Sequence, residues 1–196
     1  ILVMDDDSPD GTGERVNGLA HARIRCMNRR GLPRGLSQAV ADGFGRAGGE
    51  VIGVMDADFS HPVSAIGPLL GALEKGAEMA VGSRYITGGG IERWPWKRRV
   101  TSRVACWMAR PLTPVRDATS GFFFIRRSVL NGVFINPLGF KIGLEMIVKG
   151  RHGGKVIEVP YVFSDRRQGQ SKLSAPVIGD FLKQLAGLIA YRLKST

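Results

Sequence analysis

The sequence is poor in the residues that build disulfide frameworks and zinc sites. It contains two cysteines and three histidines among 196 residues. Cys26 and Cys106 lie far apart and form no Cys-x-x-Cys pair, so neither a disulfide framework nor a zinc knuckle is expected. Reduced thiols in a cytosolic setting are the better interpretation of this pair. So few histidines also give no convincing nucleophile–His–Asp arrangement for covalent catalysis.

Long hydrophobic runs are also missing. No apolar stretch approaches the roughly 20 residues that a membrane-spanning helix needs, and no secretory signal opens the chain. The sequence alone therefore predicts no integral membrane protein. The chain begins without Met inside the apolar run ILVM, which is typical of a strand already under way. This start predicts that an N-terminal segment precedes residue 1.

Acidic residues are scarce relative to basic ones, with 17 Asp and Glu against 28 Lys and Arg and a net charge of +11. This excess favours an anionic partner, whether nucleic acid, phospholipid or a phosphorylated small molecule. A merely basic, soluble surface is the alternative. The hydrophobic share of 43% and the charged share of 23% are typical of a globular chain. The length suits one domain over residues 1–196.

Short β-branched runs alternate with segments of helical length. Runs typical of strands cover residues 1–4, 23–27, 50–55, 78–83, 121–125 and 155–163. Apolar residues at helical spacing predict helices over 36–47 and 62–76. This alternation predicts an α/β fold, with a mostly parallel sheet and helices on both of its faces. Ligands of such sheets bind beyond the carboxyl ends of the strands.

Two later segments, 88–112 and 174–196, predict basic amphipathic helices. In the first, one face carries Val100, Val104, Trp107 and Met108, while Arg99, Arg103 and Arg110 lie elsewhere around the helix. In the second, one face carries Ile178, Phe181, Leu182, Leu185 and Ile189. Packing into the core is the usual role of such faces. The overall positive charge nevertheless favours the plane of a membrane interface.

Two aspartates follow the strand predicted over 50–55. Residues i and i+2 of extended backbone project to the same side, so Asp56 and Asp58 can face one pocket. Adjacent anions repel unless a cation neutralises them. A hard divalent ion such as Mg²⁺ or Mn²⁺ fits, because it takes oxygen ligands and completes its shell with diphosphate oxygens. Ser60 and His61 are candidates for a further ligand, although His61 is as plausible as a turn residue. A solvated acidic turn is the alternative.

A second acidic cluster, of three aspartates, ends the first predicted strand. Asp5, nearest to the strand, is the candidate for a hydrogen bond to a ribose or a nucleobase edge. Ser8 or Asp10 is the candidate for capping the next helix. The stretch GTGERVNG nearby superficially resembles a dinucleotide-binding motif. Val16 stands where that motif requires its third glycine, so we reject this interpretation.

Basic side chains lie next to hydroxyl groups in two places. Arg98 and Ser102, four residues apart, would share one face of a helix. A guanidinium group beside a hydroxyl suits a phosphate. The stretch SDRRQGQSKL adds four further side chains around a flexible glycine: Arg166, Arg167, Ser171 and Lys172. A soluble surface explains each of them singly, but the two clusters together favour a second phosphate pocket beside the metal–diphosphate site.

Eight blocks of this sequence occur in the order typical of dolichol- or polyprenol-phosphate mannosyltransferases, which are family-2 glycosyltransferases with the GT-A fold. The blocks are VMDDDSPDGT, RGLSQA, MDADFSHP, VGSRY, RWPWKRRVTSRVA, DATSGF, GFKIGLE and SDRRQGQSKL. The chain resembles this family over essentially its entire length. The resemblance implies a GT-A fold. It also implies one more strand ahead of Ile1, because family members begin with a strand that carries a Pro-Thr-Tyr-Asn-Glu-like stretch.

The resemblance implies a donor site and a divalent cation, Mg²⁺ or Mn²⁺. The residues that it places at the donor are Asp5, Asp56, Ala57, Asp58 and Arg84. Of these, Asp5 would contact the nucleoside, while Asp56 and Asp58 would hold the metal against the diphosphate. Ser60 stands where many relatives have a glutamine ligand. Arg84 would lie on a mobile loop near the donor phosphates and contribute to catalysis with the two aspartates.

The resemblance also implies a site for the lipid phosphate. Its residues would be Arg98, Ser102, Arg166 and Lys172. Asp117 lies near the reacting centre in the family pattern but receives no firm role. Two departures concern the acceptor side, since Cys106 replaces a frequent asparagine and Phe123 replaces a frequent arginine.

These roles imply an inverting transfer of mannose from GDP-mannose to a polyprenyl monophosphate, by a peripheral enzyme on the cytoplasmic face of a membrane. The nearest alternative is a polyprenyl-phosphate glucosyltransferase that uses UDP-glucose, although such relatives commonly carry added membrane spans. A non-catalytic nucleic-acid-binding α/β protein is the alternative from another class. It predicts base-stacking aromatics along a basic groove, whereas Trp94 and Trp96 cluster at one hinge, so no nucleic acid is expected as a partner.

Overall fold

Helices and strands alternate along the chain, as the sequence predicts. The computed structural model describes residues 1–165 and 175–194. The strands are β1 (Leu2–Asp5), β2 (Arg25–Asn28), β3 (Val51–Val54), β4 (Met79–Ser83), β5 (Gly90–Ile91), β6 (Phe123–Arg126), β7 (Val156–Pro160) and β8 (Val162–Phe163). The α-helices are α1 (Thr12–Gly18), α2 (Leu36–Arg46), α3 (Ile66–Glu74), α4 (Trp96–Met108), α5 (Ile142–Lys149) and α6 (Ala175–Lys194), with short 3₁₀ turns at Val63–Ala65 and Arg127–Leu130.

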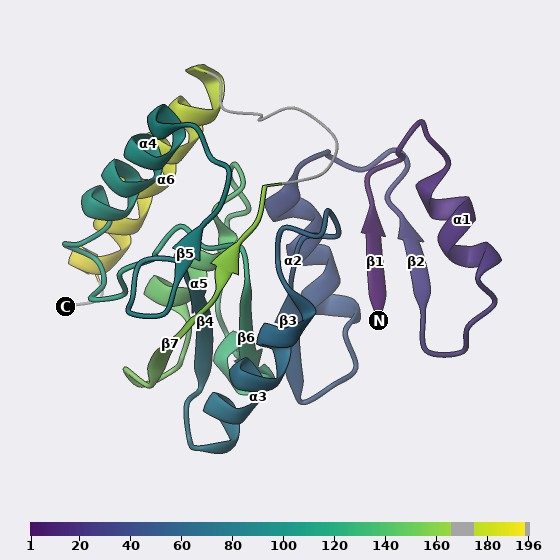
Figure 1. The fold of residues 1–196 in the computed structure, drawn as a ribbon, viewed down its shortest axis with the longest axis horizontal. Coiled ribbons are helices and arrows are strands. Elements are labelled where there is room, and N and C mark those ends of the chain that lie inside the picture. The colour runs from purple at the N-terminus through teal and green to yellow at the C-terminus, as the bar shows by residue number, and fades with distance from the viewer. Residues whose placement is uncertain (166–174, 195–196) are drawn as a thin grey trace.

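The main sheet has the strand order β3-β6-β4-β7, and three of its four strands run in the same direction. The exception is β6, which is antiparallel to both of its neighbours. β1 pairs with β2, and β5 pairs with β8, each in parallel. Figure 1 shows the β1–β2 pair at one end of the molecule, beside α2, and the helices α4 and α6 at the other end. The predicted α/β class with a mostly parallel sheet is therefore confirmed, apart from the direction of β6.

The reversal of β6 has a simple origin in the segment that precedes it. Strand–helix alternation predicts parallel strands, because a crossover helix returns the chain to the same end of the sheet. Here the chain instead passes from α4 through residues 109–122 along the carboxyl rim of the sheet. β6 then starts at that rim, where Phe123 pairs with Val54 of β3 and Val81 of β4. The residues just before β6 consequently lie at the rim where β3 and β4 end.

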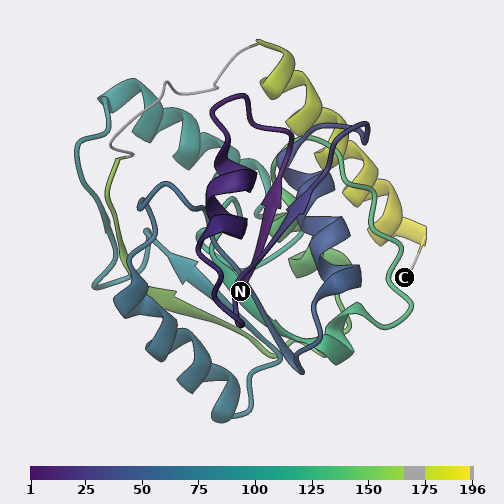
Figure 2. The ribbon, with the colours of Figure 1, turned by 90° about the vertical axis from the view of Figure 1, so that its right-hand side faces the viewer.

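The core lies on both faces of the main sheet, because successive strand residues point to opposite sides. On one face, Phe123 and Ile125 of β6 pack with residues of α2 and α5, among them Phe44 and Met146. On the other face, Phe122 packs with Leu69 and Leu73 of α3 and with Tyr161. Figure 2 shows α3 and α6 on opposite sides of the strands. Burial of each Leu or Phe contributes roughly 1.5–3 kcal/mol to the free energy of folding. The two apolar layers therefore stabilise the sheet whose carboxyl rim carries the site.

Helix α6 is attached through a third cluster. Phe181, Leu185 and Leu188 of α6 pack against Leu144 and other residues of α5 and of the segment after α4. The predicted apolar face of α6 is therefore divided, since its remaining members point outward. They are Ile178, Leu182 and Ile189, which are 45%, 45% and 40% exposed. Within the described ranges, no helix combines the length and the apolar character that crossing a bilayer requires.

Two helices depart from the sequence predictions. α5 was not predicted as a helix. Its residues from Ile142 to Val148 are buried all round, so no polar face gives the helical period. α1 begins at Thr12, whose N–H and hydroxyl groups donate to Oδ1 of Asp10 at 3.1 and 2.6 Å. The N-cap residue is Gly11, without a side-chain cap, so neither predicted cap, Ser8 or Asp10, occupies that position, although Asp10 accepts these two hydrogen bonds.

Candidate active site

The Asp56–Asp58 loop is closed by its own hydrogen bonds. The N–H of Asp56 donates to Nδ1 of His61 at 3.0 Å, and the N–H of Ser60 donates to Oδ1 of Asp58 at 3.0 Å. Both aspartates are half-buried at the carboxyl end of β3, with the exposed Ala57 between them. The loop thus holds two carboxylates within two residues at the rim of the sheet, as predicted.

His61 has a structural role in this loop. The side chain is buried and stacks on Phe122 with ring centroids 4.7 Å apart. Burial lowers the pKa of His61 to about 4, and the positive charge of Arg84 contributes, against the opposing charges of Asp58 and Asp117. The ring is therefore neutral at pH 7 and accepts the Asp56 N–H through Nδ1. Of its two predicted roles, the geometry favours the turn residue.

The residues of this loop suit a hard divalent cation. Oγ of Ser60 is buried and has no hydrogen-bond partner among the described residues, which leaves its lone pairs available to a ligand. Hydroxyl and carboxylate oxygens are the donors that Mg²⁺ and Mn²⁺ prefer. Across residues 1–165 and 175–194, no group of three or more His, Cys, Asp or Glu side chains is arranged to hold a metal. An ion at Asp56, Asp58 and Ser60 would therefore complete its shell with ligand oxygens and water.

Arg84 follows β4 and forms a buried, two-pronged ion pair with Asp117. Its Nε donates to Oδ2 and its Nη2 to Oδ1 of Asp117, both at 2.7 Å, and its backbone N–H donates to Oδ2 at 2.9 Å. Burial alone would lower the pKa of Arg84, but the hydrogen bonds and charge of Asp117 outweigh it and raise that pKa above its usual value. Asp117 thus holds the Arg84 side chain in this structure, and the mobile loop that the family resemblance implies stays a prediction.

Asp117 reaches Arg84 because β6 is reversed. It lies in the segment that passes along the rim, where its backbone N–H donates to Oε1 of Glu158 on β7 at 3.0 Å. Cys106 of α4 also lies against this carboxylate, with Sγ 3.7 Å from Oδ1. Burial raises the pKa of the Cys106 thiol, and the charge of Asp117 adds to the effect. Both Cys106 and Cys26 are free cysteines, as expected.

Three aromatic side chains, His61, Phe163 and Trp94, connect the aspartate loop to α4. Phe163 lies 5.8 Å from His61 and 5.0 Å from Trp94, measured between ring centroids. We call these three residues the aromatic junction. The guanidinium carbon of Arg84 lies 5.3 Å from the centroid of Trp94, and that of Arg98 lies 3.9 Å from it. The aspartate loop, through His61, and the guanidinium groups of Arg84 and Arg98 therefore contact one group of aromatic side chains.

Arg98 and Ser102 lie on α4, as the sequence predicts. Nη1 of Arg98 donates to Oδ1 of Asp165 at 2.9 Å, in a pair that remains partly exposed. Oγ of Ser102 accepts a hydrogen bond of 2.8 Å from the hydroxyl of Tyr85. Trp94 is the member of the junction that contacts Arg98, and its Nε1 is buried without a hydrogen-bond partner among the described residues. The other two predicted acceptor residues, Arg166 and Lys172, lie outside the described residues.

The three aspartates that follow β1, Asp5, Asp6 and Asp7, divide into structural residues and a candidate binding residue. Asp6 pairs with the buried Arg29, and its Oδ2 accepts the Gly35 N–H at 2.8 Å. Asp7 pairs with Arg30 at 3.1 Å. Asp5 is buried, and its Oδ2 accepts the Ser8 N–H at 3.3 Å. A nucleoside contact by Asp5 stays a prediction.

Lys141 is a residue of this region that sequence reasoning missed. Its Nζ donates to the carbonyl oxygen of Thr119 at 3.0 Å. Burial lowers the pKa of Lys141 to about 8, and the charge of Arg84 adds to this effect, against Asp117, Cys106 and Asp56. Lys141 therefore lies within electrostatic reach of Asp56 and Arg84. The motif GFKIGLE contains it, but a single lysine before an apolar segment has no local signature of a binding role.

Comparison with known sequences adds a family and several relatives. Residues 1–134 match the profile of the family described as Glycosyl transferase family 2. A dolichol-phosphate mannosyltransferase of Pyrococcus furiosus is 42% identical over 195 residues, which cover 97% of this chain and 55% of that protein. One of Saccharomyces cerevisiae is 42% identical, with 98% of this chain and 75% of that protein covered. A polyprenol monophosphomannose synthase of Mycolicibacterium smegmatis is 37% identical, with 95% and 74% covered. The chain thus spans about half the length of the Pyrococcus relative.

Solved structures of glucosyl-3-phosphoglycerate synthase from Mycobacterium tuberculosis have a similar fold. One, in complex with Mn²⁺ and UDP-glucose, superposes with a TM-score of 0.68 at 18% identity and covers 97% of this chain and 67% of that chain. Another, with Mn²⁺, UDP and glucosyl-3-phosphoglycerate, also has a TM-score of 0.68, at 19% identity. At such identities the likeness concerns the fold alone, and it confirms the GT-A-like architecture expected from the sequence.

Proposed function

The chain belongs to glycosyl transferase family 2, and from this premise we propose that it transfers mannose from GDP-mannose to the phosphate of a polyprenyl monophosphate. The transfer inverts C1 of the sugar and takes place at the cytoplasmic face of a membrane. The names of the relatives from Pyrococcus and yeast support the mannosyl group and the lipid phosphate. The observation that carries the proposal is the aromatic junction, which packs His61 of the aspartate loop and Arg98 of α4 on the same group of rings.

The donor diphosphate binds at the aspartate loop. Asp56, Asp58 and Ser60 would hold a Mg²⁺ or Mn²⁺ ion, as the Mn²⁺ named with a nucleotide sugar in the similar fold supports. When bound, this ion supplies positive charge opposite the diphosphate. Arg84, fixed by Asp117, and Lys141 supply two further cations near the same loop. Because their positions are set before the reaction, they stabilise the charge that develops on the leaving group without reorganisation.

The acceptor phosphate binds on the α4 side of the junction. Arg98 and Ser102 hold it, together with Arg166 and Lys172. A phosphate oxygen is already anionic at neutral pH, so it attacks C1 of mannose without a general base. The new oxygen–C1 bond forms as the bond from C1 to the diphosphate oxygen breaks, and GDP leaves with the electron pair. Attack on the face opposite to GDP inverts C1 through a transition state of oxocarbenium character.

Outward apolar side chains support a location of the enzyme at the membrane surface. On α4, Val100, Val104 and Trp107 are 50%, 49% and 74% exposed, at helical spacing. Together with the outward residues of α6 and the charge of +11, they suit the interface of an anionic leaflet. Figure 1 shows both helices at the same end of the molecule. These features support a location of this chain at the membrane surface, with its acceptor site near the lipid phosphates.

A transfer assay tests the proposal. The chain is incubated with Mn²⁺, a short polyprenyl phosphate and either radiolabelled GDP-mannose or radiolabelled UDP-glucose, and the lipid-extractable label is counted. We expect label in the lipid from GDP-mannose. Label from UDP-glucose alone would assign the glucosyltransferase alternative, and no lipid label from either donor would refute the proposal. A parallel incubation without the lipid phosphate separates transfer from hydrolysis of the donor.

A further inference from the structure

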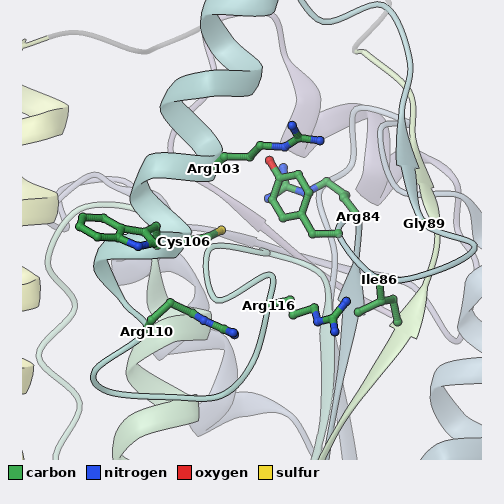
Figure 3. Close-up of a pocket in the computed structure, with 9 residues that line it drawn as sticks. Arg84, Ile86, Gly89, Arg103, Cys106, Arg110 and Arg116 are labelled. Atoms are coloured by element: carbon green, nitrogen blue, oxygen red, sulfur yellow. The ribbon is translucent and has the colours of Figure 1, made fainter.

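A cavity of about 530 Å³ lies beside α4 and carries four arginines on its lining. Arg103, Cys106 and Arg110 come from α4 and the turn after it, while Arg84 and Arg116 come from the neighbouring segments. We call this cavity the α4 arginine pocket. Figure 3 shows the Arg103 side chain above the Cys106 sulfur and the Arg110 and Arg116 side chains below it. Asp56, Asp58, Arg98 and Ser102 are not among its lining residues.

Three of these arginines carry charge that no carboxylate of the described residues pairs with. The charge of Arg84 is compensated by Asp117. Nη1 of Arg110 donates to the carbonyl oxygen of Pro114 at 2.8 Å, and the guanidinium carbon of Arg103 lies 5.8 Å from the ring centroid of Tyr85. Within the part of the chain that the structure describes, no carboxylate forms an ion pair with the guanidinium groups of Arg103, Arg110 or Arg116.

The carboxylate of Glu158 accepts hydrogen bonds from the backbone of the loop that carries Arg116 and Asp117. Oε2 of Glu158 accepts the Arg116 N–H at 2.8 Å, and Oε1 accepts the Asp117 N–H at 3.0 Å. Glu158 therefore anchors the loop that presents the Arg116 side chain to the pocket. The thiol of Cys106 adds no negative charge, because burial raises its pKa. The pocket thus gathers three positive groups that repel one another unless an anion lies among them.

The guanidinium groups and the volume of the pocket suit a phosphate. Arg103 lies on α4, which ends at Met108, and Arg110 follows in the turn after it, with Cys106 between them in the sequence. Guanidinium groups present paired donors that match phosphate oxygens. The volume of about 530 Å³ is within the range of small-molecule pockets and leaves room for a group attached to the phosphate. Trp107, 74% exposed, also lines the pocket and belongs to the outward apolar stripe of α4.

We propose that the α4 arginine pocket is a binding site for a phosphate group in addition to the donor diphosphate and the acceptor phosphate, with Arg84 as a lining residue that it shares with the donor site. The phosphate is that of a membrane lipid head group or a free phosphate, since both present the same oxygens. The inference goes beyond the proposed transfer reaction and does not depend on it. It rests on the three unneutralised guanidinium groups and the cavity that they line.

Binding measurements on the full chain test this site. The variant R103Q/R116Q removes two pocket charges whose guanidinium groups make no hydrogen bond to the described residues. The matched control R23Q/R46Q removes two exposed arginines elsewhere on the surface. Each protein is titrated calorimetrically with inorganic phosphate, and is sedimented with phosphatidylcholine vesicles with and without phosphatidic acid. We expect the pocket variant to lose affinity about tenfold or more in at least one titration, and the control to change by less than about twofold.

The phosphate titration and the vesicle sedimentation together identify the source of the phosphate. Loss of binding to inorganic phosphate, with vesicle binding retained, assigns a free phosphate. Loss of binding to phosphatidic acid vesicles, without measurable binding of inorganic phosphate by the unmodified chain, assigns a lipid head group. Equal losses in the variant and the control, or no loss in either, would overturn the site and leave only general attraction of the basic surface. Melting curves check the fold, and R116Q alone replaces the pair if the pair melts early. Because no sugar transfer is measured, these outcomes are independent of the transfer assay.

Discussion

Asp117 offers a sharp test of how the site is organised. In D117N the carboxylate that neutralises Arg84 becomes an amide, while the size of the side chain is kept. Asp117 is fully buried and the Arg84 side chain is 6% exposed, so the remaining guanidinium charge has little access to water. Removing one partner of a buried pair costs about 3–5 kcal/mol of unfolding free energy. For a chain of this size, such a loss lowers the melting temperature by roughly 6–20 °C.

Urea unfolding of D117N, compared with the unmodified chain, gives the free-energy change directly. The control is D165N, because the Arg98–Asp165 pair is partly exposed and its loss costs only about 0–1 kcal/mol. The double variant R84M/D117L replaces the pair with apolar groups and is expected to recover much of the stability. It should still lack transfer activity, since Arg84 is gone. A D117N protein that loses no more stability than D165N would refute the buried ion pair as the element that fixes Arg84.

Three further predictions concern the two halves of the site and its pH dependence. D58A should reduce mannosyl transfer to background in the radiolabel assay, whereas E74A, an exposed carboxylate variant on α3, retains it. R98A should raise the KM for polyprenyl phosphate about tenfold or more and leave the KM for GDP-mannose unchanged. An unchanged acceptor KM would count against Arg98 as a phosphate ligand. The pKa of Lys141 is about 8 against an ordinary 10.5, so kcat/KM for the donor should fall as pH rises through about 8, and K141M should abolish this step. The unfolded chain binds more protons between about 8 and 10.5, so stability should rise with pH in that window.

Local patterns in the sequence were sufficient for most of the elements. Each predicted strand run overlaps an observed strand, although the short β5 was missed, and the aspartate pair follows β3 as predicted. Arg98 and Ser102 both lie on α4, where their spacing of four residues places them on one face. These predictions succeed because each depends on a few neighbouring residues.

The features that were missed depend on distant residues or carry no period. The Arg84–Asp117 pair joins residues 33 positions apart, and nothing near Asp117 indicates a buried partner. α5 is buried all round, so its apolar residues give no helical repeat. The depressed pKa of Lys141 arises from burial and from charges on other segments. Tertiary electrostatics of this kind become visible only when the chain is folded.

The reversed strand links these observations to the chemistry. A parallel β6 would begin at the opposite edge of the sheet, and Asp117, six residues before Phe123, would lie far from Arg84. Because β6 is antiparallel, its first residue pairs with Val54 and Val81 at the rim where the aspartate loop and Arg84 begin. The carboxylate of Asp117 then holds the Arg84 guanidinium, while Asp56 and Asp58, at the end of β3, are the aspartates that we propose for the ion. The direction of a single strand therefore decides that Asp117 pairs with Arg84 at the rim where the proposed metal ligands Asp56 and Asp58 lie.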